Sequence, residues 1–222
     1  MIAGYATPEG TKKFAERQTE ISQQNYKNVH NLTLSNVGIG TYLGNADTET
    51  DKLVEYAIKK SIRGGINIID SAINYRAQKA ERSVKSAISQ LINDNDISRE
   101  EIFVSTKNGY ITNDGDIKED LMQYVIREYG KTGIVKEGDI SPGYHCMTLP
   151  YLNDQLDRSL KNLGLECIDL MYLHNSVEGQ THIPREQFLK NLKEVFDFYE
   201  KKRKEGKIKF YGMATWECFR TT

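Results

Sequence analysis

The sequence lacks a long apolar run, a net charge and a dense set of cysteines. No stretch approaches the ~20 apolar residues of a membrane-spanning helix, and the polar residues 1–31 contain no apolar centre of a secretory signal. With 30 Lys and Arg against 31 Asp and Glu, no basic surface predicts binding to nucleic acid or membrane. The three cysteines, Cys146, Cys167 and Cys218, form no closely spaced pair, which predicts reduced thiols and a cytoplasmic location.

What the chain does contain is a repeated alternation of short apolar strands with helices. Hydrophobic residues make up 38% of the chain, which is enough for a packed core. We expect a hairpin-like stretch over 31–41 that leads into a first strand, further strands over 66–70, 102–107, 168–174 and 208–216, and helices over 8–23, 51–63, 81–92, 118–129, 150–163 and 188–203. Such alternation is typical of right-handed βαβ units and a parallel sheet. No glycine-rich phosphate loop follows the first strand, which disfavours a dinucleotide-binding Rossmann fold.

Residues 108–147 interrupt this alternation with an unusually long connection. Turn-forming segments lie in it at 113–115 and 141–143, and a connection of this length in an α/β protein is usually functional or disordered. We expect the loop to cover the active face and to shape a substrate pocket. His145 and Cys146 stand side by side in it, but no third or fourth ligand lies at metal-site spacing, so no metal is expected.

Four ionisable side chains lie at or just beyond the carboxyl ends of the expected strands. Asp70, Lys107 and His174 each end a strand, and Tyr75 follows in the loop after Asp70. Alone, each has an ordinary role, as a capping aspartate, a solvated lysine, a loop histidine or a packed tyrosine. Because the carboxyl ends of parallel strands meet on the catalytic face of an α/β barrel, the four together predict one active site.

The segments at these strand ends resemble the aldo-keto reductase family. The resemblance rests on Val-Gly-Ile-Gly-Thr-Tyr at 37–42, Asn-Ile-Ile-Asp-Ser-Ala-Ile-Asn-Tyr-Arg at 67–76, Ser-Thr-Lys at 105–107, Leu-Met-Tyr-Leu-His-Asn at 170–175 and Gly-Lys-Ile-Lys-Phe-Tyr-Gly at 206–212. It covers nearly the whole chain, and it looks most like a microbial branch with a Thr-Pro-Glu-Gly-Thr start, a long loop after the third strand and Ala-Thr-Trp in the fifth. The resemblance implies a (β/α)8 TIM barrel that reduces the carbonyl of a small aldehyde or ketone with NAD(P)H, with NADPH the more usual cofactor.

The resemblance also implies that Asp70, Tyr75, Lys107 and His174 form a catalytic tetrad. Carbonyl reduction places negative charge on the oxygen, so the site must hold that oxygen and protonate it. Tyr75 would donate the proton, helped by the Lys107 ammonium because a nearby positive charge stabilises a phenolate. Asp70 would position Lys107 and keep it charged. His174 would hydrogen-bond the carbonyl oxygen and orient the substrate.

The same resemblance implies where the nicotinamide end of the cofactor binds. The implied residues are Gly40, Thr41, Tyr42, Asp70, Asn175 and Thr215. Ala214 and Thr215 stand where many relatives have a Ser-Asn pair that holds the carboxamide. One hydroxyl and one amide are therefore missing from that contact in this chain.

The length of the chain bears on the completeness of the barrel. A complete eight-stranded barrel usually takes about 250 residues, and this chain has 222. We expect an incomplete barrel with about five of the eight βα units, in which residues 1–36 form a helix and hairpin that close the barrel bottom and residues 37–222 form the partial barrel as a single domain. Since strand number, tilt and shear are linked, we expect this chain alone to lack most of the cofactor clamp, to bind NADPH weakly or not at all, to be weakly active or inactive, and to be unstable or to associate.

Two other functions remain open from the sequence. A lysine at a barrel strand end can form a Schiff base with a carbonyl substrate, as in aldolases, with Lys107 as the nucleophile. A member of this fold can also bind cofactor without catalysis, as a sensor or as a subunit of a larger assembly. The Asn-Tyr-Arg loop after Asp70 favours the reductase, and a purely binding role does not require Tyr75 beside Lys107.

Overall fold

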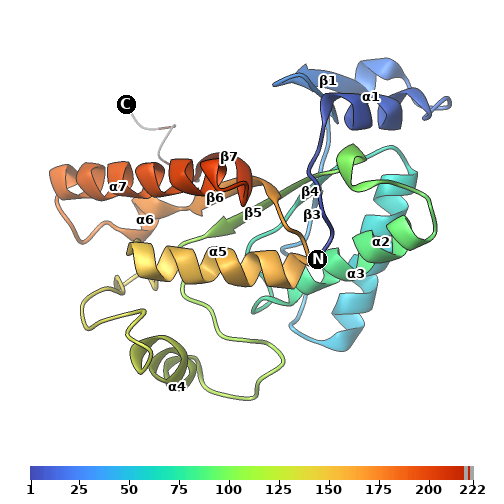
Figure 1. Cartoon of the computed structure of the whole chain (residues 1–222). Helices are drawn as coiled ribbons and strands as arrows, with labels where there is room; N and C mark the ends of the chain where they lie inside the picture. The colour runs from blue at the N-terminus through green and yellow to red at the C-terminus, as the bar shows by residue number, and fades with distance from the viewer. Residues whose placement is uncertain (218–219, 221–222) are drawn as a thin grey trace.

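A five-stranded parallel sheet forms the centre of the computed structural model, which describes residues 1–217 and 220 (Figure 1). Its strands are β3 (Ile39–Gly40), β4 (Ile68–Asp70), β5 (Phe103–Asn108), β6 (Ile168–His174) and β7 (Ile208–Ala214). They lie in the sheet in the same order as in the chain, and each pairs in parallel with the next. A doubly wound sheet reverses its strand order at a switch point, whereas consecutive order is that of an α/β barrel. The described residues form an incomplete α/β barrel, as the sequence predicts.

Helices connect the strands and cover one face of the sheet. The helices are α1 (Pro8–Glu16), α2 (Thr48–Arg63), α3 (Lys79–Asn93), α4 (Leu121–Val125), α5 (Leu149–Leu163), α6 (Ser176–Gly179) and α7 (Arg185–Lys204), with short turns η1 (Gln23–Asn25) and η2 (Arg99–Glu101) and a π-helical turn η3 (Ile126–Gly130). Helix α2 packs on α3, α3 on α5 and α5 on α7, and Figure 1 shows this series following the sheet. Such a row of neighbouring helices is the outer layer of a barrel.

Some expected helices differ from the observed ones. The helix expected over 8–23 ends at Glu16, and the side chain of the next residue, Arg17, forms an ion pair with Glu101. The helix expected over 118–129 is divided into α4 and η3. The short helix α6, directly after β6, was not expected.

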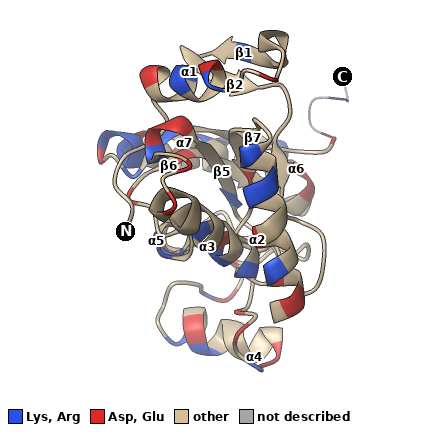
Figure 2. Cartoon of the chain, turned by 90° about the vertical axis from the view of Figure 1, so that its right-hand side faces the viewer, with Lys and Arg blue, Asp and Glu red and all other residues tan. Residues whose placement is uncertain are grey.

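An antiparallel hairpin of β1 (Tyr26–Val29) and β2 (Leu32–Ser35) lies over the amino ends of the sheet strands. The expected hairpin-like stretch at 31–41 therefore begins earlier in the chain, and the first sheet strand is reduced to the two residues of β3. Leu34 packs in one cluster with Phe103, the first residue of β5. Figures 1 and 2 show the hairpin and α1 together at one end of the molecule and α4 at the other.

The main hydrophobic core lies between the sheet and its helices. Alternate strand residues that point toward the helices are fully buried, namely Ile69, Val104, Met171 and Leu173. They pack with buried helix side chains that include Ile58, Ile88, Leu156 and Val195. Because side chains alternate between the two faces of a strand, the polar residues at the strand ends lie on the opposite face.

Charges and thiols are distributed as in an ordinary globular surface and core. Figure 2 shows basic and acidic residues interspersed along α1 and α2. None of the helices within residues 1–217 and 220 is both long and apolar enough to cross a membrane. Cys146 and Cys167 are buried free thiols, and Cys218 lies outside the described residues.

Candidate active site

The parallel strands bring the predicted catalytic residues to one edge of the sheet. Asp70 ends β4, His174 ends β6, and Lys107 is the next-to-last residue of β5. The register of these strands places the three side chains on the face away from the helices. The loop after β4 returns Tyr75 over the same edge, where its ring meets that of His174. All four residues of the implied tetrad lie together.

Lys107 is the centre of this cluster. Its Nζ lies 2.6 Å from Asp70 Oδ2, 2.8 Å from the Ser71 carbonyl oxygen and 3.2 Å from the Tyr75 phenol oxygen. An ammonium has three N–H donors, so these three acceptors engage all of them. The Lys107 side chain is only 8% exposed, whereas the Asp70 side chain is 40% exposed. The positive charge therefore faces the phenol oxygen and the carboxylate rather than bulk solvent.

Tyr75 is followed by a turn with an unusual backbone. Residues 76–78 all have positive φ, at 48°, 51° and 73°, a conformation that costs a residue with a side chain about 1–2 kcal/mol. The Arg76 guanidinium lies 2.7 Å from the Asp51 carboxylate on α2 and donates to Ser83 Oγ on α3 over 2.9 Å. These contacts from two helices hold the strained turn and with it the loop that carries Tyr75.

His174 is buried at the end of β6 beside two aromatic rings. Its ring centroid lies 5.7 Å from that of Tyr75 and 5.1 Å from that of Tyr110, both edge to face. Its Nδ1 lies 3.2 Å from the side-chain oxygen of Asn74. Burial and the nearby charge of Lys107 lower the pKa of His174 to about 3. The imidazole is therefore neutral at physiological pH.

A second buried histidine ties the long connection after β5 to this site. His145 Nε2 lies 2.8 Å from the His174 carbonyl oxygen, and its Nδ1 lies 3.0 Å from the amide nitrogen of Gln180. The ring fits only because Gly109 and Gly179 lie against it, since a Cβ at either position would overlap the imidazole. Burial lowers the pKa of His145 to about 4, so this ring is also neutral. Among the residues that the structure describes, no group of three or more His, Cys, Asp or Glu is arranged to hold a metal ion.

A cavity of about 360 Å³ opens beside the cluster. Its lining residues are Tyr75, Lys107, Tyr172, His174, Asn175, Met213, Ala214, Thr215 and Trp216. Small-molecule pockets span roughly 300–1,000 Å³, so this cavity has room for one aromatic ring of a ligand and a small substrate. Three of the four tetrad residues face it, and Asp70 lies behind Lys107.

Three residues implied in cofactor binding lie at or near this cavity. Asn175 and Thr215 line it, and the exposed Tyr42 packs edge-on against Tyr75 with ring centroids 4.9 Å apart. The Thr215 hydroxyl also donates to Glu178 Oε1 over 2.6 Å. An amide and a hydroxyl beside a hollow are the donors and acceptors that a nicotinamide carboxamide needs. The residues present therefore fit the nicotinamide end of the cofactor.

The other implied cofactor residues belong to the strand ends. A Cβ added at Gly40 would meet no atom within 4 Å, so the end of β3 leaves open space. Thr41 is buried, and its hydroxyl donates to the Asp70 carbonyl oxygen over 3.2 Å and lies 3.0 Å from Ser71 Oγ. Thr41 thus holds β3 to β4 rather than facing a ligand.

The side chains of three further residues contact side chains of the tetrad, and the sequence does not predict these contacts. Ser105 Oγ donates to Asp70 Oδ1 over 2.7 Å. Because Ser105 lies two positions before the strand-end lysine, strand alternation would have placed it on the same face. Asn74 and Tyr110 reach His174 from loops, and no periodic pattern indicates such contacts.

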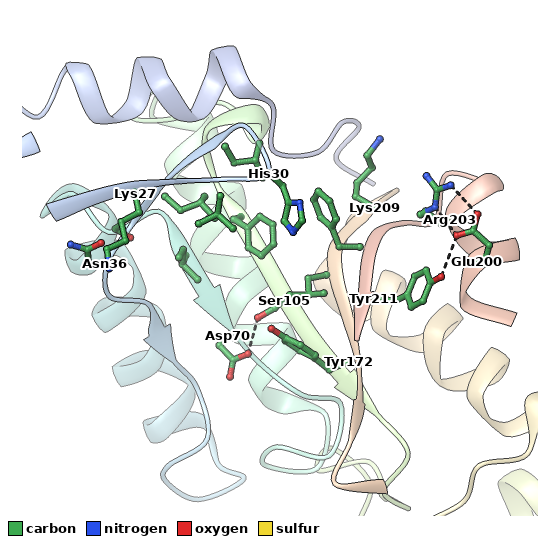
Figure 3. A pocket seen from close by; sticks show the side chains of 18 residues that line it. Lys27, His30, Asn36, Asp70, Ser105, Tyr172, Glu200, Arg203, Lys209 and Tyr211 are labelled. Carbon is green, nitrogen blue, oxygen red and sulfur yellow. Dashed lines mark hydrogen bonds and ion pairs between the residues drawn. The ribbon is translucent and has the colours of Figure 1, made fainter. Parts of the chain in front are cut away.

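A second hollow, of about 840 Å³, lies on the same sheet face toward the amino ends of the strands (Figure 3). Apolar side chains from the hairpin and the sheet make up much of its lining, including Leu34, Ile68, Phe103, Leu170 and Phe210. Figure 3 shows Asp70 and Tyr172 close to one another at its edge, and Tyr172 lines both hollows. The larger hollow therefore gives access to the Asp70 carboxylate from the side away from Lys107, in keeping with its partial exposure.

Comparison with known proteins gives one consistent result. Residues 36–221 match the model of the aldo/keto reductase family. Over 124 residues the chain is 32% identical to the aldo-keto reductase yakc [NADP(+)] of Schizosaccharomyces pombe, an alignment that covers 56% of this chain and 26% of that protein.

Solved structures show the same fold. The chain is similar to aldo-keto reductase AKR11C1 from Bacillus halodurans in its holo form, with a TM-score of 0.52, 21% identity and coverage of 86% of this chain and 50% of that one. It is similar to an aldo/keto reductase from Klebsiella pneumoniae in complex with NADP and acetate, with a TM-score of 0.53, 19% identity and coverage of 86% and 49%.

This chain therefore spans about half the length of these solved structures and a smaller share of the curated relative. The shared fold confirms the predicted incomplete α/β barrel. The family match confirms the resemblance seen at the strand ends, and it covers all but the first 35 residues and the last one. The chain belongs to the aldo/keto reductase family.

Proposed function

We propose that the protein transfers a hydride between NADPH and the carbonyl group of a small aldehyde or ketone. The observation that supports this most strongly is the contact of the Lys107 ammonium with the Tyr75 phenol oxygen, with Asp70 bound to the same nitrogen. The relatives support the choice of cofactor. The Schizosaccharomyces pombe protein carries NADP(+) in its name, and two Klebsiella pneumoniae structures contain NADP or NADPH.

The reaction assigns a separate task to each of three side chains. NADPH, when bound, supplies the hydride for the carbonyl carbon. Negative charge then collects on the carbonyl oxygen, and Tyr75 gives its hydroxyl proton to that oxygen, which yields an alcohol. The Lys107 ammonium stabilises the phenolate that remains. Asp70 holds Lys107 in position through its short ion pair.

His174 is assigned the task of holding the carbonyl oxygen. It lines the cavity with Tyr75 and Lys107. Since its pKa is lowered to about 3, mainly by burial, the ring is neutral and forms a hydrogen bond without competing with Tyr75 as the proton donor. A neutral ring also avoids a second positive charge beside Lys107.

The nicotinamide end of NADPH is assigned to residues at three strand ends. Asn175 and Thr215 would bind the carboxamide, with Tyr42 beside the ring. Gly40 would leave the space that the ring needs, because nothing lies within 4 Å of a Cβ there. Thr41 would contribute by fixing the end of β3.

The geometry at Lys107 does not favour the two alternatives. A Schiff base requires a free amine, whereas the Lys107 nitrogen is engaged with the Asp70 carboxylate and two further acceptors. A purely cofactor-binding or assembly role would not require a phenol at the same nitrogen. The reductase is the function that uses every member of the cluster.

We also propose that residues 1–36 close the amino end of the barrel and that 37–222 act as one domain. Two hydrogen bonds support the first part. The Asn67 side chain, directly before β4, accepts from the Ser35 amide over 2.9 Å and donates to the Thr33 carbonyl over 3.0 Å. The hairpin is thereby fixed to the sheet by polar contacts as well as by apolar packing.

An isotope-transfer experiment tests the proposed function. The purified protein is given NADPH deuterated at the transferable position of the nicotinamide, together with a panel of simple aldehydes and ketones. We expect an alcohol product that carries deuterium on the former carbonyl carbon. Consumption of NADPH with formation of an alcohol that lacks the label would contradict the proposal.

A further inference from the structure

The hydrogen-bonding role of His174 depends on which ring nitrogen carries its single hydrogen. In a neutral imidazole one nitrogen donates and the other accepts. Nδ1 lies 3.2 Å from the Asn74 side chain. Nε2 has no hydrogen-bond partner within residues 1–217 and 220, and the ring lines the cavity. Nε2 is thus the nitrogen left for a ligand.

The charged surroundings keep the ring in its neutral form. Lys107 on β5 opposes a positive charge on His174, as does His145 in the long connection when it is itself charged at low pH, and Glu178 on α6 favours one. Burial is the largest effect. At neutral pH the ring therefore holds one hydrogen, and its position is set by the partner of Nδ1.

The Asn74 side chain can form a hydrogen bond with either tautomer of His174. An Asn side chain has an accepting oxygen on one side and a donating NH2 on the other. With the oxygen toward Nδ1, as in the structure, Nδ1 carries the hydrogen and Nε2 can only accept. With the NH2 toward Nδ1, the hydrogen is on Nε2, which can then donate.

The two arrangements suit different stages of the reaction. A carbonyl oxygen only accepts hydrogen bonds, so it needs a donating Nε2. The alcohol formed from it has a hydroxyl hydrogen to donate, and an accepting Nε2 suits it. This requirement rests on the function proposed above, whereas the contact between Asn74 and His174 does not.

We propose that Asn74 is a positioning residue whose amide orientation is coupled to the tautomer of His174. When the amide makes a half-turn, Nδ1 releases its proton to solvent and Nε2 takes a proton from solvent water that enters the cavity, so that Nε2 changes from a hydrogen-bond acceptor into a donor for the carbonyl substrate. In the ligand-free protein the amide oxygen faces Nδ1, and His174 carries its hydrogen there. The neighbouring His145 lacks this freedom, because its Nε2 faces a backbone carbonyl oxygen, which accepts only. His145 is therefore fixed with its hydrogen on Nε2.

Nitrogen-15 NMR of the histidine side chains tests the assignment without any assay of activity. The chain has four histidines, and the His174 signals are identified by their loss in His174→Gln. In the ligand-free protein we expect a protonated Nδ1 and a bare Nε2 for His174, and the opposite pattern for His145. Asn74→Asp presents only acceptors and should keep the His174 pattern. Asn74→Leu removes the partner and should move both His174 nitrogen shifts toward averaged values.

The His145 signals serve as the control for folding, since they should be unchanged in every variant. His174 nitrogen shifts that are identical in wild type and Asn74→Leu, with His145 unchanged, would overturn the inference. A bare Nδ1 on His174 in the ligand-free protein would also overturn it.

A kinetic measurement tests the consequence for the reaction. Asn74→Asp holds His174 in the accepting form, so we expect kcat/KM for reduction of a simple ketone to fall by about tenfold or more, because one transition-state hydrogen bond is lost. Unchanged kcat/KM in Asn74→Asp would contradict the half-turn. If the wild type shows no carbonyl reduction while the tautomer still follows residue 74, the proposed function fails and the control of the tautomer by Asn74 stands.

Discussion

The ammonium nitrogen of Lys107 lies 3.2 Å from the phenol oxygen of Tyr75 and 4.7 Å from the centre of its ring. The pairing of β4 with β5 and the strained turn after Tyr75 together create this contact. Because Lys107 is buried, solvent screens its charge less than at the surface. In the proposed reaction this charge would stabilise the phenolate that remains after Tyr75 gives up its proton.

Removal of the ammonium should abolish most of the turnover. Lys107→Met keeps a side chain of similar length without the charge, and we expect carbonyl-dependent NADPH oxidation to fall about 100-fold or more. NADPH binding, followed by nicotinamide fluorescence, should change little because no proposed cofactor contact is removed. Lys85→Met, at an exposed lysine on α3, is the matched control and should turn over like wild type. Normal turnover in Lys107→Met would exclude the assigned role.

Replacement of Arg76 should change the stability of the protein in two ways. It removes the ion pair with Asp51, and it alters a residue with a strained backbone conformation. Arg76 is held at a φ of 48°, and its side chain is 1% exposed. Arg76→Ala loses the pair and keeps the strained backbone, while Arg76→Gly loses the pair and relieves the strain. Asp51 keeps Lys79 as a second partner at 2.8 Å, so we expect Arg76→Ala to cost about 1–3 kcal/mol.

Comparison of the two variants isolates the backbone contribution. Arg76→Gly should be more stable than Arg76→Ala by about 1 kcal/mol. The measurement is denaturant unfolding of both variants beside wild type. Equal stability of the alanine and glycine variants would mean that the turn carries no strain.

The buried His145 predicts a pH dependence of stability. The pKa of His145 is about 4 in the folded protein and about 6.5 in an unfolded chain. Between these values the unfolded state binds more protons, so the free energy of unfolding falls as the pH is lowered from about 6.5 to 4, by up to roughly 3 kcal/mol from this group. His174, whose pKa is also lowered, acts in the same direction.

A pair of variants separates His145 from the other titrating groups. His145→Gln retains an N–H donor for the His174 carbonyl, and its stability should fall less between pH 6.5 and 4 than that of wild type. His182→Gln, at an exposed histidine, should keep the wild-type slope. The measurement is urea unfolding across that range. Equal slopes in wild type and His145→Gln would contradict burial of the neutral ring.

The strand pattern was sufficient to predict the sheet and the residues at its carboxyl edge. The run at 168–174 is a strand with those bounds, and Asp70 and His174 end their strands as expected. Strand alternation determines which face such residues occupy, and parallel pairing determines which edge they share. Both are local or repeating properties, so they can be read from the sequence.

The contacts that orient the site could not be predicted in this way. The approach of Asn74 to His174 joins residues 100 positions apart, and the same loop contains left-handed backbone angles at 76–78 that no residue type there favours. His145 reaches β6 from the irregular connection after β5, in a space left by two glycines. Such contacts arise from the packing of loops, for which the sequence has no period.

The most direct test of the central claim is the turnover of Tyr75→Phe. The change removes one oxygen and leaves the ring that packs against His174. The claim predicts that kcat for carbonyl reduction falls about 100-fold or more while NADPH affinity stays the same, and that Tyr56→Phe, at an exposed tyrosine on α2, retains wild-type kcat. A Tyr75→Phe protein that reduces carbonyls as fast as Tyr56→Phe would contradict the role of Tyr75 as the proton donor.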